Sequence, residues 1–446
     1  MKVIWEMSGN MLGSSDARTQ KAKAILAEIA GIADLPFSVR LWQEDPIPLG
    51  QSVTPGLELT IRSPGVVSDL VRHPTVDRLV DHYATGGFTI EGGTLLDLAA
   101  GHDDDPKRRK LFKKLNKSNL LKAGLPFLIG KGESPNARNS FTGSTGEVAT
   151  AGKADQDYVR FHYDISNDFY RLFLDPQMQY TCGYFPSWDA SLEDAQEAKL
   201  DMICRKLRLK PGDRLLDIGC GWGGLLIWAA KHYGVEAYGV TLSQEQFDLG
   251  QERIKAAGLS ERVTMEIRDF RDITGTFDKV SSIGMFEQVG FDHHTAYFRK
   301  IQSLLRPRGL LLNHAITRRG KPTLKQFRKK KKEYKAITDY IFPGGEVDHI
   351  GHSLMMMESN GFEVHDVENW REHYALTSEH WCRRLYANRD AAVSAVGLEK
   401  TRIWLLYLAG VSLGFKRGSI QIFQTVASKR TKGPAGLPPT RSDLYA

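Results

Sequence analysis

Residues Arg214 to Gly224 read RLLDIGCGWGG, and they contain the strongest signal for the fold. The first five residues are a short apolar run of strand length, and Leu225 to Tyr233 have the composition of a helix. Glycines at a strand-to-helix turn let the backbone approach a ligand closely, and the start of the helix offers unpaired N–H groups. A glycine-rich turn is a weak signal by itself, so its neighbours decide what it means.

Three more strand-like segments follow at spacings that leave room for helices between them: Glu236–Val240, Val263–Ile267 and Lys279–Ile283. Strands that alternate with helices predict a parallel sheet with helices on both faces. The predicted fold class is therefore α/β, with a Rossmann-like sheet.

The ends of these strands distinguish two kinds of cofactor site. In a nicotinamide enzyme the second strand usually ends in Asp or Glu, which binds the ribose. Here that strand runs into Thr241, whereas an acid, Asp217, stands two positions before Gly219. This arrangement resembles the class I methyltransferases, which use S-adenosylmethionine. We therefore predict a class I methyltransferase sheet.

The chain has 446 residues, which favours a catalytic domain with an accessory domain. Residues 1–130 alternate strand-like and helical pieces and predict a small N-terminal α+β domain. Residues 131–157 are rich in Gly, Ser, Thr, Asn and Ala, which predicts a flexible linker. Residues 158–446 then form the predicted methyltransferase domain with its C-terminal helices.

The net charge of +7 is unevenly distributed. Basic residues from Lys107 to Lys117 alternate with Leu111, Phe112 and Leu115, a pattern that could lie on an anionic membrane surface. A solvated helix face is the alternative, and it is the better interpretation of the second basic cluster, residues 328–332. No recognised nucleic-acid module accompanies either cluster, so we expect no nucleic-acid partner.

Several observations bear on location. No run of about 20 apolar residues is present, and the N-terminus does not have the pattern of a secretion signal. Four cysteines without a paired spacing fit a reducing compartment. We expect a cytoplasmic protein that is peripheral at the inner face of the cell membrane.

Two upstream segments extend the resemblance: HYDIS at residues 162–166 and QYTCGYF at residues 179–185. With DIGCGWGG, TLSQEQ, GMFEQVG and YIFPGG, they resemble the cyclopropane-fatty-acyl-phospholipid synthases and the mycolic acid cyclopropane synthases, from about Tyr158 onward. The resemblance implies transfer of a methylene group from S-adenosylmethionine to the double bond of unsaturated acyl chains. The additional N-terminal domain favours acyl chains of membrane phospholipid as substrate, and a homodimer is left open.

The same resemblance assigns cofactor contacts to the glycine turn, its flanking strands and the upstream segment. The cofactor residues that it implies are Tyr180, Thr181, Asp217, Gly219, Gly221, Thr241, Gln246, Phe270 and Arg271. Thr241 and Gln246 would hold the ribose, and Phe270 with Arg271 the adenine. We predict no metal site, and we interpret His293, His294, Cys204 and Cys382 as structural.

Members of this family also bind bicarbonate beside the reacting methyl group. The matching positions are Cys182, Glu287, His314, Ile316 and Tyr374. Methylation of an alkene leaves a carbocation, and closing the ring then requires a base in a dry pocket. Bicarbonate can be that base, with Glu287 orienting the network or receiving the proton. Without the resemblance, Cys182 would be a small buried hydrophobe and His314 a core histidine.

Two other functions remain open at this point. A carbocation relieved by hydride shift or by loss of a neighbouring proton gives a methyl-branched or methylene fatty acid. The chain could also be a non-catalytic lipid-binding protein that retains a methyltransferase shell, although its complete motifs argue against this.

Overall fold

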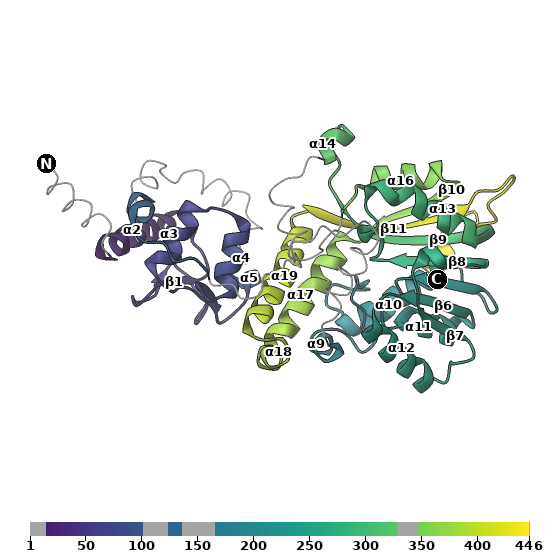
Figure 1. Cartoon of the computed structure of the whole chain (residues 1–446), viewed down its shortest axis with the longest axis horizontal. Coiled ribbons are helices and arrows are strands. Elements are labelled where there is room, and N and C mark those ends of the chain that lie inside the picture. The colour runs from purple at the N-terminus through teal and green to yellow at the C-terminus, as the bar shows by residue number, and fades with distance from the viewer. Residues whose placement is uncertain (1–14, 101–123, 136–165, 329–345, 446) are drawn as a thin grey trace. The chain divides into compact units, whose positions relative to one another are not determined.

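The computed structural model describes residues 15–100, 124–135, 166–328 and 346–445 (Figure 1). Contacts within the chain define two compact units, Met1–Ser140 with Leu385–Gly410, and Phe141–Arg384 with Val411–Ala446. The predicted domain boundaries at residues 130 and 157 stay predictions. The basic cluster at residues 107–117 and the YIFPGG segment lie outside the described residues, as do four of the five residues of HYDIS.

The first unit contains a four-stranded sheet in the order β2-β1-β3-β4. Strands β1 and β3 are parallel, and β2 and β4 pair with them in antiparallel orientation. Alternate residues of β1, Val39 and Leu41, are buried in a core that includes Phe127, as expected for a strand with one covered face. The elements are α2 (Ser15–Ala33), β1 (Ser38–Leu41), β2 (Ile47–Pro48), β3 (Glu58–Ile61), α3 (Pro64–Arg72), α4 (Val76–Ala84), β4 (Phe88–Glu91), α5 (Leu95–Ala99), α18 (Arg389–Val396) and α19 (Leu398–Lys416) up to Gly410.

The second unit contains a seven-stranded sheet in the order β10-β11-β9-β8-β5-β6-β7. The pairings from β9 through β8, β5 and β6 to β7 are all parallel, whereas β11 is antiparallel to both of its neighbours. The strands are β5 (Arg214–Ile218), β6 (Glu236–Thr241), β7 (Val263–Ile267), β8 (Phe277–Ile283), β9 (Leu305–Arg318), β10 (Phe362–Asn369) and β11 (Ile420–Lys429). The predicted α/β class is confirmed, and the sheet is parallel as predicted except for β11.

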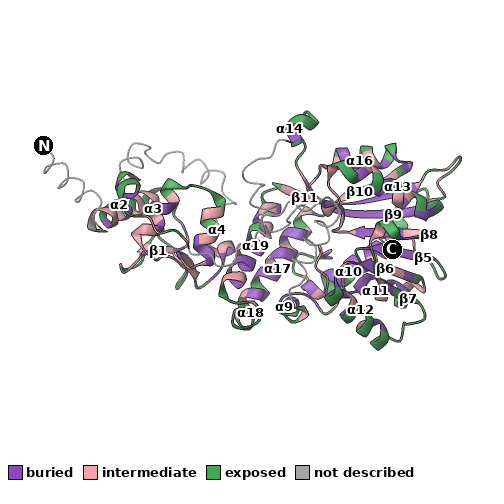
Figure 2. Cartoon of the chain, viewed as in Figure 1, coloured by how far each residue is buried: buried purple, intermediate pink, exposed green. Residues whose placement is uncertain are grey.

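Both faces of this sheet are covered. Adjacent residues of a strand point to opposite faces, so a covered sheet has both of them buried. In β5, Leu215 belongs to one buried apolar cluster and Leu216 to another. Figure 2 shows these central strands as buried, with exposed residues on the outer sides of the helices. The helices of this unit are α9 (Asn167–Arg171), α10 (Leu192–Lys206), α11 (Gly224–Tyr233), α12 (Gln244–Ala256), α13 (His294–Leu304), α14 (Leu324–Arg328), α16 (Ile350–Ser359) and α17 (Arg371–Ala387) up to Arg384, with short 3-10 helices η2 (Phe270–Asp272), η3 (Phe286–Gln288), η4 (Phe291–His293) and η5 (Ser442–Leu444).

Among the described helices, none combines the length and the apolar character that crossing a membrane requires.

Candidate functional site

The glycine-rich turn lies between β5 and α11. Gly219 and Gly221 have φ angles of 79° and 55°, in the left-handed region that side chains other than glycine rarely adopt. A Cβ atom added to Gly221 would meet no atom within 4 Å, so open space adjoins the turn at this residue. The N–H groups of Gly219 and Cys220 both donate to the carbonyl of Val240, which ties the turn to the end of β6.

Two predicted cofactor residues meet at the end of β6. The Thr241 hydroxyl donates to Oε1 of Gln246 at 2.7 Å and accepts the N–H of Ser243 at 3.2 Å. All three residues are buried, and the Ser243 side chain accepts the N–H of Gln246 as the N-cap of α12. The polar pair is therefore held in a fixed arrangement beside the glycine turn.

Asp217 is buried within the sheet, just before the turn. Its Oδ1 accepts a hydrogen bond of 2.7 Å from the hydroxyl of Ser281 on β8. Burial raises the pKa of Asp217 to about 6, although the Ser281 hydrogen bond and the charge of Lys199 act in the opposite direction. In the described residues this acid joins β5 to β8, which stabilises the strand that carries the turn.

A buried lysine that the sequence did not identify supports the upstream segment. Lys199 lies on α10 with no exposed side-chain surface, and its Nζ donates to the Thr181 hydroxyl at 3.0 Å and to Oε1 of Gln179. Burial lowers the pKa of Lys199 to about 8, and the charges of Asp175 and Asp217 oppose this shift. Lys199 therefore positions Thr181, one of the predicted cofactor residues.

Tyr180, the neighbour of Thr181, belongs to an aromatic cluster. Its ring centroid lies 5.1 Å from that of Trp381, 5.5 Å from that of Tyr170 and 6.2 Å from that of Phe173. Such tilted and edge-on contacts fix ring orientations as well as burying area.

The predicted adenine residues lie on η2, directly after β7. The Phe270 ring packs edge-on against Tyr297 at 5.6 Å and is half-buried. The Arg271 Nε donates to Asp269 Oδ1 at 2.9 Å. Phe270 therefore has a fixed ring at the C-terminal edge of the parallel strands, where α/β folds bind their ligands.

Glu287 is the most strongly perturbed acid of the site. It follows β8 on η3, and its Oε1 accepts the N–H of Ile316 at 2.6 Å. Its Oε2 is buried without a hydrogen-bond partner among the described residues. Burial raises the pKa of Glu287 to about 7, since desolvation outweighs the Ile316 hydrogen bond. A carboxyl group in this state can accept or release a proton near neutral pH.

His314 is on β9, two residues before Ile316, and is fully buried. The amide Nε2 of Gln424 on β11 lies 3.2 Å from its Nδ1. Because an amide nitrogen can only donate, Nδ1 is assigned as acceptor and Nε2 as the protonated nitrogen. Burial lowers the pKa of His314 well below its usual value, so the ring is neutral. Its Nε2 has no hydrogen-bond partner in the described residues.

Cys182 is buried and its thiol stays protonated. The Sγ lies 3.2 Å from the carbonyl oxygen of Gly183 and 3.8 Å from that of Trp370. Burial raises the pKa of the Cys182 thiol well above its usual value, which excludes a thiolate nucleophile. The Trp370 ring also packs edge-on against His314 at 5.2 Å, so Trp370 joins two predicted bicarbonate residues.

Tyr374 lies on α17 and is 8% exposed. Its ring packs against Phe415 at 4.6 Å and against Trp381 at 5.9 Å. Trp381 also contacts Tyr180, so the predicted bicarbonate residue Tyr374 and the predicted cofactor residue Tyr180 share one aromatic neighbour.

The structure thus brings several predicted residues together. Thr241 is bonded to Gln246, and Glu287 is bonded to the Ile316 backbone. No hydrogen bond joins Glu287 to His314 within the described ranges, and each has a buried atom without a partner there. The chemical roles of the predicted residues stay predictions.

Lys199 and Gln424 were not predicted as site residues from the sequence. A lysine within a helix usually reads as a solvent-facing residue, and a glutamine within a strand carries no motif. Only the three-dimensional contacts reveal that both support predicted site residues.

Comparisons with known proteins bear on this site. A sequence model of the family described as mycolic acid cyclopropane synthetase matches residues 151–425. The chain is 36% identical over 417 residues to a probable fatty acid methyltransferase from Pseudomonas putida, covering 92% of this chain and 96% of that protein. It is 38% identical over 271 residues to the cyclopropane-fatty-acyl-phospholipid synthase of Escherichia coli, covering 60% of this chain and 66% of that protein.

Among solved structures, a mycolic acid cyclopropane synthase complexed with SAH and CTAB is similar with a TM-score of 0.58 and 34% identity. The match covers 61% of this chain and 98% of that chain. The predicted class I methyltransferase fold is therefore confirmed. Because the family match spans more than half of the residues and includes the whole site, the chain belongs to the mycolic acid cyclopropane synthetase family of S-adenosylmethionine-dependent methyltransferases.

Proposed function

We propose that the chain methylates the double bond of unsaturated acyl chains in membrane phospholipid and closes the product to a cyclopropane ring. The observation that carries this proposal concerns two buried atoms that have no hydrogen-bond partner in the part of the chain that the structure describes, Glu287 Oε2 and His314 Nε2. A ring closure needs a proton acceptor shielded from water, and these two groups supply protected polar atoms.

The residues present fit the cofactor. The open space beside Gly221 and the adjacent Thr241–Gln246 pair support a ligand that lies against the turn with its ribose at the end of β6. When bound, S-adenosylmethionine supplies an electrophilic methyl group on sulfur. In this proposal the glycine turn and Tyr180 hold the methionine end, and Phe270 and Arg271 the adenine.

The acyl double bond acts as the nucleophile. Its π electrons form a bond to the methyl carbon while the methyl–sulfur bond breaks. The electron pair of the broken methyl–sulfur bond stays on the leaving sulfide. The acyl chain then carries a positive charge on the other alkene carbon. Loss of a proton from the new methyl group releases the electron pair that closes the ring. The buried site excludes water, which would otherwise capture the cation.

A proton acceptor such as bicarbonate needs both a hydrogen-bond donor and a hydrogen-bond acceptor beside it. His314 Nε2–H is a donor, whereas Glu287 Oε2 accepts when ionised and donates when protonated, and its pKa of about 7 allows both forms near neutral pH. These orphaned atoms fit an oxyanion that carries one proton, such as bicarbonate. When bound there, bicarbonate supplies the base. Cys182, Ile316 and Tyr374 complete the proposed surroundings of the anion.

The direct test is product analysis. Purified chain is incubated with S-adenosylmethionine and vesicles of a phospholipid with one double bond in each acyl chain. We expect fatty acids that have gained one CH2 and show cyclopropane signals by nuclear magnetic resonance. Products that keep an olefinic signal, or no product at all, would contradict ring closure.

A second candidate is transfer that yields a methylene fatty acid, in which a hydride shifts from the methylated carbon to the cationic carbon and a proton then leaves the new methyl group. It is favoured by the match over 92% of the chain to a protein named probable fatty acid methyltransferase. Its product has the same mass as the cyclopropane, so mass alone does not distinguish them. Catalytic hydrogenation under mild conditions distinguishes the two products, because the methylene product takes up hydrogen whereas the cyclopropane does not.

We also propose that the chain acts in the cytoplasm at the inner face of the membrane, where its substrate is available. The alternation of basic and apolar residues between Lys107 and Lys117 supports this proposal. A homodimer stays a prediction, and light scattering of the purified chain tests it.

A further inference from the structure

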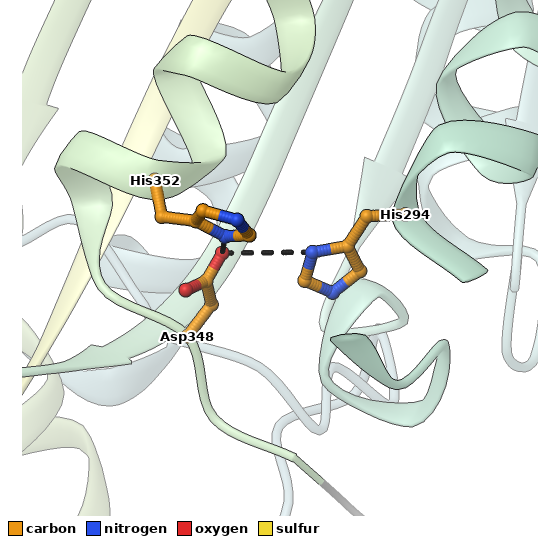
Figure 3. A group of neighbouring side chains, drawn as sticks. All are labelled: His294, Asp348 and His352. Carbon is orange, nitrogen blue, oxygen red and sulfur yellow. Dashed lines mark hydrogen bonds and ion pairs between the residues drawn. The ribbon is translucent and has the colours of Figure 1, made fainter. Parts of the chain in front are cut away.

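Three side chains from two distant parts of the sequence converge beside the sheet of the second unit. His294 begins α13, Asp348 lies two residues before α16, and His352 is on α16 (Figure 3). Their exposed fractions are 0%, 2% and 8%, so all three are buried. One potential metal-ligating atom from each residue lies within 4.8 Å of those of the other two.

The contacts of the carboxylate are well defined. Asp348 Oδ2 lies 2.8 Å from His352 Nδ1 and accepts a hydrogen bond from the Ser353 hydroxyl at 3.0 Å. Its Oδ1 accepts the N–H of His349 at 2.7 Å. The carboxylate is therefore held in one orientation, with Oδ2 facing both histidines, as Figure 3 shows.

His294 is different, because neither of its ring nitrogens has a hydrogen bond within the described ranges. Its Nδ1 lies 3.6 Å from Asp348 Oδ2, which is too long for a hydrogen bond. Neither ring nitrogen has a hydrogen-bond partner among the described residues, although the side chain is fully buried. One face of the ring stacks on Phe286 with centroids 4.3 Å apart. Burying an imidazole in this way costs free energy unless something binds its nitrogens.

We propose that His294, Asp348 and His352 bind a divalent metal ion of the Zn²⁺ class. Imidazole nitrogen and carboxylate oxygen are ligands that zinc accepts. Two ligands each about 2.0–2.1 Å from zinc at a tetrahedral angle lie about 3.4 Å apart, close to the 3.6 Å between His294 Nδ1 and Asp348 Oδ2. The orphaned nitrogen then has a partner, and Ser353 and His349 orient the carboxylate from the second layer.

The location suggests what the ion does. Phe286, which stacks on His294, precedes Glu287, and the Glu287 carbonyl accepts the N–H of Glu346. An ion bound by His294 and Asp348 would therefore connect the start of α13 to the segment before α16. Both of these segments contact η3, the short helix that carries Glu287. Three protein ligands of this kind stabilise the local structure, and the ion takes no part in the methyl transfer proposed above.

The test measures metal content, which does not depend on turnover. Full-length chain without a histidine tag is stripped with a chelator, dialysed against Zn²⁺ and analysed by mass spectrometry for zinc. We expect one tightly held ion per chain. Titration with Co²⁺ should give the visible absorption of a tetrahedral or five-coordinate site, and Zn²⁺ should abolish it. A stripped chain that binds neither ion at micromolar concentration would overturn the proposal.

Matched variants locate the ion. His294→Ala and Asp348→Asn should each weaken Zn²⁺ binding at least about 100-fold, because each removes a ligand rather than an outer partner. His293→Ala, an exposed neighbour on η4, should bind like the unaltered chain. Equal affinity of His294→Ala and His293→Ala would refute the site. If His294→Ala fails to fold, as judged by circular dichroism, Asp348→Asn and the Co²⁺ spectrum of the unaltered chain still decide the question.

Discussion

At the scale of single residues, Glu287 is the group on which the proposed mechanism depends. Its carboxyl is buried with a pKa raised to about 7, and one of its oxygens has no partner among the described residues. We expect Glu287→Gln to lower turnover by about two to four orders of magnitude, the usual contribution of a positioned proton-transfer group. Affinity for S-adenosylmethionine, measured by calorimetry, should stay unchanged.

The same variant tests the anion. Removing bicarbonate from assays of the unaltered chain should slow turnover, and combining this with Glu287→Gln should add little, because both changes disable one relay. Normal product formation by Glu287→Gln in carbonate-free buffer would show that the base lies elsewhere.

Gly221 offers a residue-scale test of the cofactor site. We expect Gly221→Val to abolish S-adenosylmethionine binding, because its side chain would enter the open space beside the turn. A valine at φ 55° is also strained, so the control must carry the same strain. Gly258→Val is that control, since Gly258 has φ 68° and open space after α12. Calorimetry should show binding to Gly258→Val only, and equal affinities would contradict the assignment.

At the scale of elements, η3 is fastened to β9 by the hydrogen bond from the Ile316 N–H to Glu287. Burial raises the pKa of Glu287 from 4.5 to about 7, so between these values the folded chain binds more protons than the unfolded one. The stability due to this group is therefore complete below pH 4.5 and is lost as pH rises through about 7. From pH 5 to pH 8, the free energy of unfolding of Glu287→Gln should therefore rise by roughly 1–3 kcal/mol relative to that of the unaltered chain.

Urea unfolding at both pH values measures this difference. Glu252→Gln, on the exposed side of α12, is the control and should follow the unaltered chain. A pH dependence that is identical in the Glu287 and Glu252 variants would show that Glu287 is not shifted.

The elements also show what sequence can and cannot predict. The strands β5, β6, β7 and β8 were predictable because short apolar runs alternate with helical segments. The ends of β9 were less so: the apolar run at residues 310–316 indicates its centre, but the strand begins at Leu305, where Arg306, Pro307 and Arg308 interrupt the pattern. Pairing with β8 and β11 extends the strand beyond what its own composition suggests.

The candidate site follows the same division. Thr241 and Gln246 were predictable because they are five residues apart in one motif, and their hydrogen bond joins neighbouring elements. Lys199 and Gln424 were not, because their contacts with Thr181 and His314 depend on how distant elements pack. The grouping of His294 with Asp348 depends likewise on the packing of α13 near α16.

At the scale of the whole molecule, the proposed phospholipid substrate would present a problem of access, because its acyl chains lie within a bilayer. We propose that the basic residues between Lys107 and Lys117 attach the chain to anionic lipid. We expect sedimentation with vesicles to require anionic phospholipid and to weaken with salt, since charges are screened over about 10 Å at 0.1 M salt. The apolar residues of the segment should preserve part of the binding.

Charge-reversal variants distinguish the contribution of this segment to vesicle binding from that of the overall net charge. Lys110→Glu with Lys113→Glu should weaken binding to anionic vesicles at least about ten-fold, since each lysine near such a surface contributes about 1 kcal/mol. Lys231→Glu with Lys255→Glu changes the net charge equally at exposed positions of α11 and α12, and should have a smaller effect. Equal losses in the two pairs would mean that only overall charge matters, and equal binding to neutral and anionic vesicles would mean that the basic segment is a solvated surface.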